Sequence, residues 1–339
     1  MTMSSSSSIA FLFPGQGSQK VGMGKALYDA SPLARAVFDE ADGALGFSLS
    51  KLCFEGPETD LTLTANAQPA ILTTSIAALR VVQAETDLRP SVVAGHSLGE
   101  YSALVAAGSL SLTDAVRVVN ARGRFMQEAV APGVGAMAAI LGLEPADVEA
   151  ACAEASAEVA GEIVSPANFN GGRQIVIAGH KAAVDRACAA AKARGATRAL
   201  PLSVSAPFHC QLMQPAAERL SLELAKIQFR APSVPVIANV DAAPNTDGAR
   251  VASLLVQQVT GSVRWEQTVQ RLEAMHVTRA LEIGQGTVLA GLAKRITRAF
   301  VVRPAGDPAS IAALSAPADT GTSSVPTAKD GKEKEQTDA

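Results

Sequence analysis

Apolar and polar positions along this chain of 339 residues follow two patterns, short wholly apolar runs and longer stretches with apolar residues at helical spacing. The apolar runs at residues 9–13 and 92–95 predict buried strands. The helical spacing predicts helices at residues 67–82, 98–107 and 114–129. Strands that alternate with helices in this way predict a parallel sheet covered by helices on both faces.

A different pattern fills residues 135–203. Two helical stretches separate four apolar runs here, in the order strand, helix, strand, strand, helix, strand. The predicted strands lie at residues 136–143, 163–167, 174–178 and 198–204, and the predicted helices at 145–156 and 182–193. A turn is expected at residues 168–172, between the two middle strands. This order of elements is that of a ferredoxin-like unit.

Alternation of strands and helices resumes after the insertion. Strands are predicted at residues 234–240, 280–283 and 300–302, and helices at 249–259, 266–275 and 287–296. The expected fold is therefore α/β, with a hydrolase-like parallel-sheet large domain and an inserted ferredoxin-like small subdomain.

The expected domain boundaries follow from these patterns. We assign residues 9–131 and 205–315 to the α/β catalytic domain and residues 132–204 to the insert. The polar ends of the chain, residues 1–8 and 316–339, are expected to be disordered. A cleft between the large and the small body is a natural place for a ligand.

The composition narrows the class of protein. Hydrophobic residues make up 48% and charged residues 18%, an ordinary globular balance, and the net charge of −3 gives no electrostatic reason to expect nucleic acid. The four cysteines are scattered, so we expect neither a disulfide framework nor a metal site. The N-terminus lacks the pattern of a signal peptide, and its apolar run is too short to span a bilayer. We expect a cytoplasmic protein that does not contact a membrane.

The strongest chemical signal is the sequence Gly-His-Ser-Leu-Gly at residues 95–99, which follows a predicted strand and opens a predicted helix. Gly-x-Ser-x-Gly in that context is typical of a nucleophile elbow, a tight turn that exposes the hydroxyl of Ser97 at the end of a strand. A serine in that position suits acyl transfer through a covalent ester.

Ser97 needs a general base, and the chain has four histidines. His96 is adjacent to Ser97, where side chains of a sharp turn diverge, so a packing or hydrogen-bonding role is expected for it. His180 and His276 lie in stretches expected to be solvated. His209 lies where the chain returns from the insert to the large domain, at the expected cleft, and is the best candidate base by elimination.

The tetrahedral oxyanion of acyl transfer needs hydrogen-bond donors. One candidate is the backbone N–H of Leu98, immediately after the nucleophile. The other is the loop that contains Gln16, because the glycines on either side let the backbone turn an N–H toward a ligand. An arginine in the cleft would bind a carboxylate in bidentate fashion, and either Arg122 or Arg124 is suitable; spacing alone does not decide between them.

Six motifs occur in the order found in a known family. They are Phe-Pro-Gly-Gln-Gly-Ser-Gln at 13–19, Gly-His-Ser-Leu-Gly-Glu-Tyr at 95–101, Arg-Gly-Arg-Phe-Met-Gln at 122–127, Asn-Phe-Asn at 168–170, Pro-Phe-His-Cys at 207–210 and Glu-Ile-Gly at 282–284. Over residues 9 to 315 the chain resembles the bacterial malonyl-CoA:acyl-carrier-protein transacylases of fatty-acid synthesis, and the related acyltransferase domains of polyketide synthases.

The resemblance implies a role for each matching residue. Ser97 would be the acylated nucleophile and His209 its base, with Gln16 and Leu98 supplying the N–H groups of the oxyanion hole. Arg122 would pair with the free carboxylate of the malonyl group. Gln258 matches the position whose backbone carbonyl orients the histidine in place of the aspartate of a triad.

The sequence departs from the family pattern at two positions. Ser262 stands where the family often has a proline, shortly after Gln258. Phe208 replaces the serine often found before the histidine, and its ring is expected to crowd a substituent on the malonyl α-carbon. Malonyl would then be favoured over methylmalonyl.

The resemblance also implies the reaction and its partners. The malonyl group would pass from malonyl-CoA to Ser97 and then to the phosphopantetheine thiol of acyl carrier protein, with no cofactor of the enzyme's own. The expected state is a monomer that binds neither nucleic acid nor membrane. An acidic carrier would need a basic rim near the cleft, for which Lys192, Arg194 and Arg198 are candidates.

Three alternatives compete with this interpretation. The first is a polyketide-type acyltransferase acting in trans on malonyl-CoA or methylmalonyl-CoA. The second is a serine (thio)esterase, which would need an acidic residue behind the histidine; Glu162 and Asp185 lie between Ser97 and His209 in sequence but belong to the insert. The third is a carrier-binding scaffold that has lost catalysis.

Overall fold

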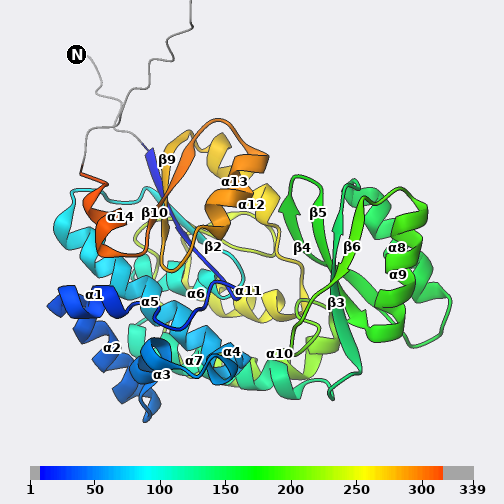
Figure 1. Ribbon diagram of the computed structural model, residues 1–339, viewed down its shortest axis with the longest axis horizontal. Coiled ribbons are helices and arrows are strands. Elements are labelled where there is room, and N and C mark those ends of the chain that lie inside the picture. Colours follow the sequence, from blue (N-terminus) through cyan, green and yellow to red (C-terminus); the bar gives the residue numbers. More distant parts are fainter. Residues whose placement is uncertain (1–7, 316–339) are drawn as a thin grey trace, which may run out of the picture.

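The computed structural model describes residues 8–315, and the expected disordered ends lie outside the described residues except for Ser8, which already belongs to the first strand. Two bodies lie side by side, a large one that holds both ends of the described chain and a smaller one that contains residues near the middle (Figure 1). Within residues 8–315 no helix is both long and apolar enough to cross a membrane.

The large body is built on a sheet of six strands in the order β10-β9-β1-β2-β7-β8. Their bounds are β1 Ser8–Phe13, β2 Val92–Gly95, β7 Val236–Ile237, β8 Pro244–Asn245, β9 Val277–Ile283 and β10 Val301–Ala305. Every neighbouring pair is parallel except β7 and β8, which pair antiparallel. The central strands β1 and β2 pair from Ala10 opposite Val92 to Phe13 opposite Gly95, so their carboxyl ends open at one edge of the sheet.

Helices cover both faces of this sheet, as the alternation along the sequence predicts. They are α1 Lys25–Ala30, α2 Pro32–Leu45, α3 Leu49–Glu55, α4 Glu58–Thr62, α5 Thr64–Glu85, α6 Gly99–Ala106, α7 Leu112–Glu128, α10 Gln214–Leu224, α11 Gly248–Thr260, α12 Trp265–Ala274, α13 Val288–Ile296 and α14 Pro308–Ala312. Successive side chains of β1 point to opposite faces. Phe11 and Phe13 pack in the core formed with α5 and α7, and Leu12 packs in the core formed with α12 and α13.

The small body has the predicted order of elements. They are β3 Gly135–Leu141, α8 Pro145–Ala157, β4 Val164–Gly171, β5 Gln174–His180, α9 Lys181–Ala193 and β6 Arg198–Pro201. The four strands form an antiparallel sheet in the order β4-β5-β3-β6, the ferredoxin-like arrangement. Side chains such as Ile140 and Ile177 form a separate core with α8 and α9. The expected α/β fold with a ferredoxin-like insert is therefore confirmed, while the boundaries at 132 and 204 remain our proposal.

Backbone hydrogen bonds join the two bodies beside β4. The N–H of Val263 donates to the carbonyl of Ala167 at 2.9 Å, and the N–H of Phe169 donates back to Val263 at 2.9 Å. The hydroxyl of Ser262 adds a bond of 2.6 Å to the carbonyl of Pro166. The segment that follows α11 thus forms a short parallel bridge to the small sheet.

Several elements differ from the sequence-based expectation. The turn predicted at 168–172 is shorter, because residues 168–171 continue β4 in its ladder with β5. The strand predicted at 234–240 pairs over only two residues, and the one predicted at 198–204 ends at Pro201. The helices α1 to α4 and α10 lie in stretches for which no element was predicted.

Candidate active site

Ser97 stands on a sharp turn between β2 and α6, as the motif predicts. Its backbone is in the left-handed region with φ of 51°, a conformation that costs energy for any residue but glycine. The flanking glycines are required by space: a Cβ on Gly95 would collide with the backbone of Gly99, and one on Gly99 would collide with the carbonyl of Phe13. The turn therefore fits only this spacing of small residues around the serine.

The structure places His209 directly against Ser97. The Oγ of Ser97 and the Nε2 of His209 are 2.7 Å apart, and the Nδ1–H of His209 donates to the backbone carbonyl of Gln258 at 2.8 Å. Because the carbonyl can only accept, Nε2 carries the lone pair that receives the serine proton. Burial, with the charge of Arg122 adding to it, lowers the pKa of His209 to about 3. The imidazole is therefore neutral at pH 7 and able to act as a base.

Of the two candidate arginines, Arg122 reaches the site and Arg124 is exposed. The guanidinium of Arg122 donates from Nη1 to Oε1 of Gln68 at 2.8 Å and from Nη2 to Oε1 of Gln258 at 2.9 Å. The same Nη2 lies 3.3 Å from the hydroxyl of Ser97. A fixed cation is thus held one hydrogen bond away from the nucleophile.

The apolar stripe of α7, rather than the spacing of the two arginines, distinguishes them. Arg122 continues the buried stripe of α7, which comprises Ala115, Val118, Val119, Phe125 and Met126 at spacings of three and four residues. Arg124 lies off that stripe. An arginine inside an apolar stripe points to a buried role.

Two backbone N–H groups near Ser97 have no hydrogen-bond acceptor among residues 8–315, those of Leu98 and Gln16. The N–H of Ser97 itself is occupied, because it donates to Oδ1 of Asn239 at 2.7 Å. The Gln16 side chain donates to Oγ1 of Thr64 at 3.1 Å, which fixes the loop between β1 and α1 beside the elbow. The two predicted donors are therefore both unpaired within residues 8–315.

A buried polar network supports the elbow from below, and the sequence did not reveal it. Asn239 accepts from the N–H of Ser97 and donates from Nδ2 to the carbonyl of Gly95 at 2.7 Å. Oε2 of Glu100 accepts from the N–H of Asn239 at 3.0 Å and from Nε2 of Gln258 at 2.7 Å. Glu100 follows Ser97 by three residues in the first turn of α6. A carboxylate among the mainly apolar residues of that helix was the one feature of the sequence that pointed to this network.

The other three histidines lie away from the Ser97 hydroxyl or make other bonds. Nε2 of His96 is 2.9 Å from Oδ1 of Asn170, and its ring lies 5.5 Å from that of Trp265. His276 is exposed, as expected. His180 is half-buried rather than solvated, because its Nδ1 accepts the N–H of Ile163 at 3.0 Å across the small sheet.

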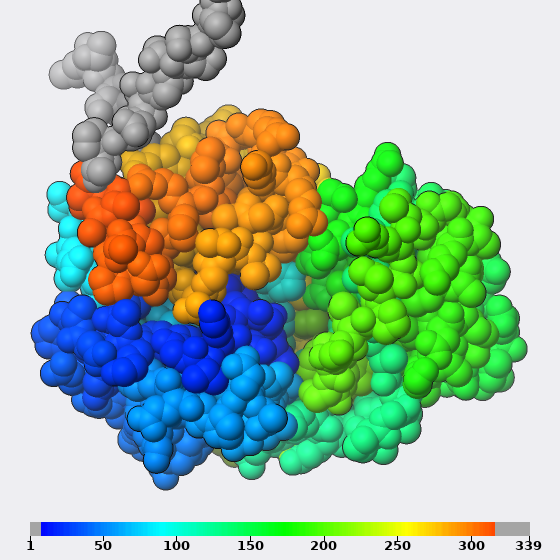
Figure 2. Space-filling model, viewed as in Figure 1, coloured from blue at the N-terminus to red at the C-terminus, as the bar shows by residue number. Residues whose placement is uncertain are grey.

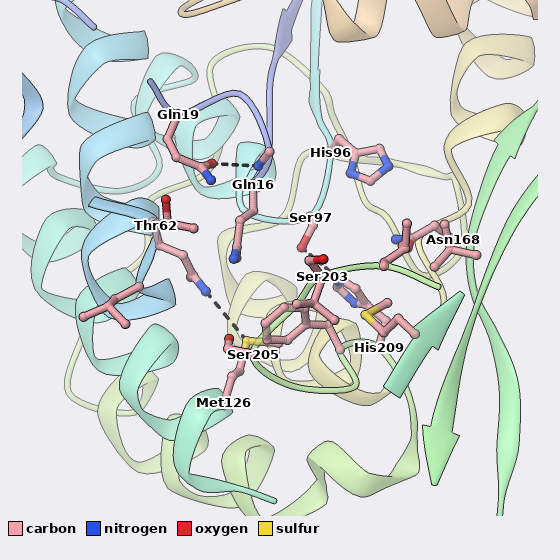
Figure 3. Close-up of a pocket in the computed structure, with 18 of the residues that line it drawn as sticks. Gln16, Gln19, Thr62, His96, Ser97, Met126, Asn168, Ser203, Ser205 and His209 are labelled. Atoms are coloured by element: carbon pink, nitrogen blue, oxygen red, sulfur yellow. Dashed lines mark hydrogen bonds between the residues drawn. The ribbon is translucent and has the colours of Figure 1, made fainter. Parts of the chain in front are cut away.

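A cavity of about 360 Å³ lies between the two bodies and is lined by Gln16, Ser97, Arg122 and His209 among others. The hollow is visible in Figure 2 between the N-terminal half of the large body and the small body. In Figure 3 the hydroxyl of Ser97 points toward His209, while Gln16 and Gln19 lie on the opposite wall. Phe208 also lines the cavity, beside His209.

The acidic residues that a hydrolase triad would need are elsewhere. Glu162 pairs with Arg186 at 2.9 Å, and Asp185 pairs with Lys181 at 2.7 Å, all within the small body. Neither carboxylate contacts His209, whose Nδ1 is bonded to a carbonyl. In the part of the chain that the structure describes, no three side chains of His, Cys, Asp or Glu are grouped to hold a metal ion.

An elbow serine, a neutral histidine and a buried arginine in a cleft between an α/β domain and a ferredoxin-like subdomain define a serine-dependent acyl-transferring enzyme. The chain belongs to the acyl transferase domain family, whose model matches residues 10–310. The malonyl CoA-acyl carrier protein transacylase of Escherichia coli K12 is 51% identical over 304 residues, which cover 90% of this chain and 97% of that protein.

Solved structures agree with this assignment. The acyl carrier protein S-malonyltransferase of Vibrio cholerae superimposes with a TM-score of 0.88 at 46% identity and covers 91% of this chain and 100% of its own. A malonyl-transacylase in complex with a type II PKS acyl-carrier protein gives a TM-score of 0.87 at 46% identity, covering 91% and 98%. The resemblance carried by the six motifs is therefore confirmed.

Proposed function

We propose that this protein transfers the malonyl group of malonyl-CoA to the phosphopantetheine thiol of an acyl carrier protein, supplying units for chain extension in fatty-acid synthesis. The observation that carries the proposal is the position of Arg122, whose Nη2 lies 3.3 Å from the Ser97 hydroxyl in the cleft. The relatives with about half of their residues identical are named malonyl CoA-acyl carrier protein transacylases, which supports the same reaction.

The first half-reaction acylates Ser97. His209 takes the hydroxyl proton at Nε2 while Oγ forms a bond to the thioester carbonyl carbon, and the N–H groups of Leu98 and Gln16 receive the oxyanion. When the tetrahedral intermediate collapses, the carbon–sulfur bond breaks and His209 returns its proton to the leaving CoA thiolate. The product is malonyl-Ser97 and free CoA.

The second half-reaction repeats these steps with a new nucleophile. The pantetheine thiol of the carrier protein gives its proton to His209 and attacks the ester carbonyl, and Ser97 leaves with that proton. Only the two substrates take part, and we assign no cofactor to the reaction.

Arg122 supplies selectivity and favours transfer over hydrolysis. Its Nη1 and Nη2 groups form the planar fork that suits a carboxylate, and Arg122 lines the cavity with Nη2 3.3 Å from the nucleophile. A malonyl carboxylate held there fills the space in line with the ester, where a water molecule would otherwise attack.

One solved relative forms a complex with a carrier of a type II PKS, so a polyketide-type acyltransferase acting in trans is the second candidate. Lys192 and Arg198 are exposed on the small body and stay our proposal for the carrier-binding rim, whereas Arg194 already pairs with Glu154 at 2.6 Å. We also retain a cytoplasmic location and a monomeric state as predictions from the sequence.

The test is intact mass spectrometry after incubation with malonyl-, methylmalonyl- and acetyl-CoA, with and without holo acyl carrier protein. We expect a malonyl adduct on the enzyme that disappears as the carrier gains the same mass. Release of free malonate without a carrier adduct would instead support a thioesterase, and absence of any adduct would support a non-catalytic scaffold.

A further inference from the structure

Glu100 is a buried carboxylate that none of the steps above uses. It lies in the first turn of α6 and is 3% exposed. Beyond its polar partners it borders a small apolar space formed by Leu104, Val236 and Leu254. Burial of an acidic group at such a place is costly unless its charge is compensated.

Arg122 is a buried cation that lacks a direct counter-charge among the described residues. Its side chain is 2% exposed, and no carboxylate oxygen of residues 8–315 lies within ion-pair distance of it. Its direct partners are two neutral amide oxygens and one hydroxyl, and its Nε has no partner among the described residues. The guanidinium cannot lose its proton at neutral pH, so it remains a buried cation.

The side-chain amide of Gln258 connects these two buried charges. Its Nε2 donates to Oε2 of Glu100 at 2.7 Å, and its Oε1 accepts from Nη2 of Arg122 at 2.9 Å. The amide dipole therefore points its positive end at the carboxylate and its negative end at the guanidinium. In this orientation each hydrogen bond strengthens the other.

We propose that Glu100 is a positioning residue that acts as the counter-charge of Arg122 through the Gln258 amide, and so sets how tightly Arg122 holds a substrate carboxylate. The inference rests on the proposed function, because it concerns the same arginine and the same acyl group. A malonyl carboxylate and Glu100 would be two anions that share one guanidinium. The negative charge of Glu100 then keeps malonyl from being held so tightly that it cannot leave for the carrier.

The surroundings of Glu100 make its charge responsive to the substrate. The pKa of Glu100 is raised to about 7, chiefly by burial; the N–H groups of Asn239 and Gln258 and the charge of Arg122 oppose the rise, and Asp241 adds to it. The other ionisable groups close to this network are Tyr101, whose ring centroid is 5.5 Å from the guanidinium carbon, and the neutral His209. Once malonyl neutralises Arg122, the carboxylate of Glu100 loses that support and takes up a proton.

The first test is Glu100→Gln, which keeps an acceptor oxygen for Asn239 and Gln258 but removes the charge. At pH 8, one unit above the pKa of Glu100, we expect the KM for malonyl-CoA to fall on the order of tenfold, the rate of malonyl transfer to the carrier to fall, and the KM for acetyl-CoA to stay within about twofold. The matched control is Glu282→Gln, another buried carboxylate, which binds the N–H groups of Leu289 and Ala290 at the start of α13. It should leave the ratio of the two KM values unchanged.

A second measurement needs no change at Glu100. Calorimetry of malonyl-CoA binding to Ser97→Ala at pH 7, in two buffers of different ionisation enthalpy, reports protons taken up on binding. We expect uptake with malonyl-CoA and none with acetyl-CoA.

Equal changes for both acyl groups in Glu100→Gln, or no proton uptake with malonyl-CoA, would overturn the inference. Wild-type enzyme that still forms malonyl-Ser97 in either case leaves the proposed function standing. Wild-type enzyme that never loads malonyl overturns the proposed function itself.

Discussion

Replacement of Arg122 by alanine separates recognition of the malonyl carboxylate from the chemistry at Ser97. A charge-assisted hydrogen bond to a guanidinium contributes roughly 1.5–3 kcal/mol, and a bidentate pair makes two. Part of this binding energy is offset because the carboxylate replaces existing contacts: Nη2 in the free site already contacts Gln258 at 2.9 Å and Ser97 at 3.3 Å. A net loss of about 3 kcal/mol corresponds to a fall of roughly 10²-fold in kcat/KM for malonyl-CoA.

The assay is rapid-quench loading followed by intact mass, with malonyl-CoA and acetyl-CoA run on the same preparation. The loss of Arg122 leaves Oε1 of Gln68 without its donor, which destabilises the fold by about 1–3 kcal/mol. That cost affects both substrates equally, so the malonyl-to-acetyl ratio isolates the carboxylate contact. Arg124→Ala, two residues along the same helix and exposed, is the control that should preserve the ratio. If Arg122→Ala kept its preference for malonyl, the role assigned to the arginine would be wrong.

Four further predictions concern the nucleophile, the base and the acyl pocket. Ser97→Ala should give no malonyl adduct by intact mass while still binding malonyl-CoA, and an adduct at any other residue would refute the assignment. His209 should sustain loading at saturating malonyl-CoA from pH 8 down to about 5, because its pKa is lowered from 6.5 to about 3, whereas a midpoint near 6.5 would show a solvated base. The same shift means that the folded site binds this proton less well than the unfolded chain does. The contribution of His209 to stability is therefore complete above pH 6.5 and falls as the pH drops toward 3. The free energy of unfolding in urea, plotted against pH over this range, should have a different slope for wild type and for His209→Gln. Phe208→Ser should raise methylmalonyl loading relative to malonyl by roughly tenfold in a competition experiment, since one methyl group in a pocket is worth about 1–3 kcal/mol, and an unchanged ratio would show that the ring does not exclude the substituent.

The elements that the sequence predicted well have strong periodicity over many residues. The helix α7 has buried positions at spacings of three and four residues along most of its length, and local sequence decides its structure. The run at 234–240 shows why other predictions were wrong. Ala238 and Asn239 are buried as the pattern requires, but only Val236–Ile237 pair in the sheet, because apolar content reports burial and not hydrogen-bond pairing. The chain leaves the ladder there and carries Asn239 under the elbow.

The candidate site was predictable where a motif fixes the local backbone. The glycines around Ser97 determine the elbow, and the apolar stripe of α7 contains Arg122. The contacts of Gln258 were not predictable from spacing, since its side chain meets Glu100 across 158 residues and Arg122 across 136. Such contacts depend on how the sheet brings distant helix ends together, and no period in the sequence encodes that.

The backbone carbonyl bonded to His209 also explains why the site needs no acidic residue as the third member of a triad. A carboxylate at that position would raise the pKa of the imidazole, and it would offer the guanidinium of Arg122 a permanent anion beside the substrate. The backbone carbonyl of Gln258 fixes the same tautomer through a bond of 2.8 Å while adding no charge. The side chain of the same residue meanwhile keeps the buried carboxylate of Glu100 on the far side of its amide from Arg122. Gln258 thus orients a neutral base and adds no anion beside Arg122, which stays able to bind a substrate carboxylate. An aspartate in its place would also orient the base, but it would compete with the substrate for Arg122.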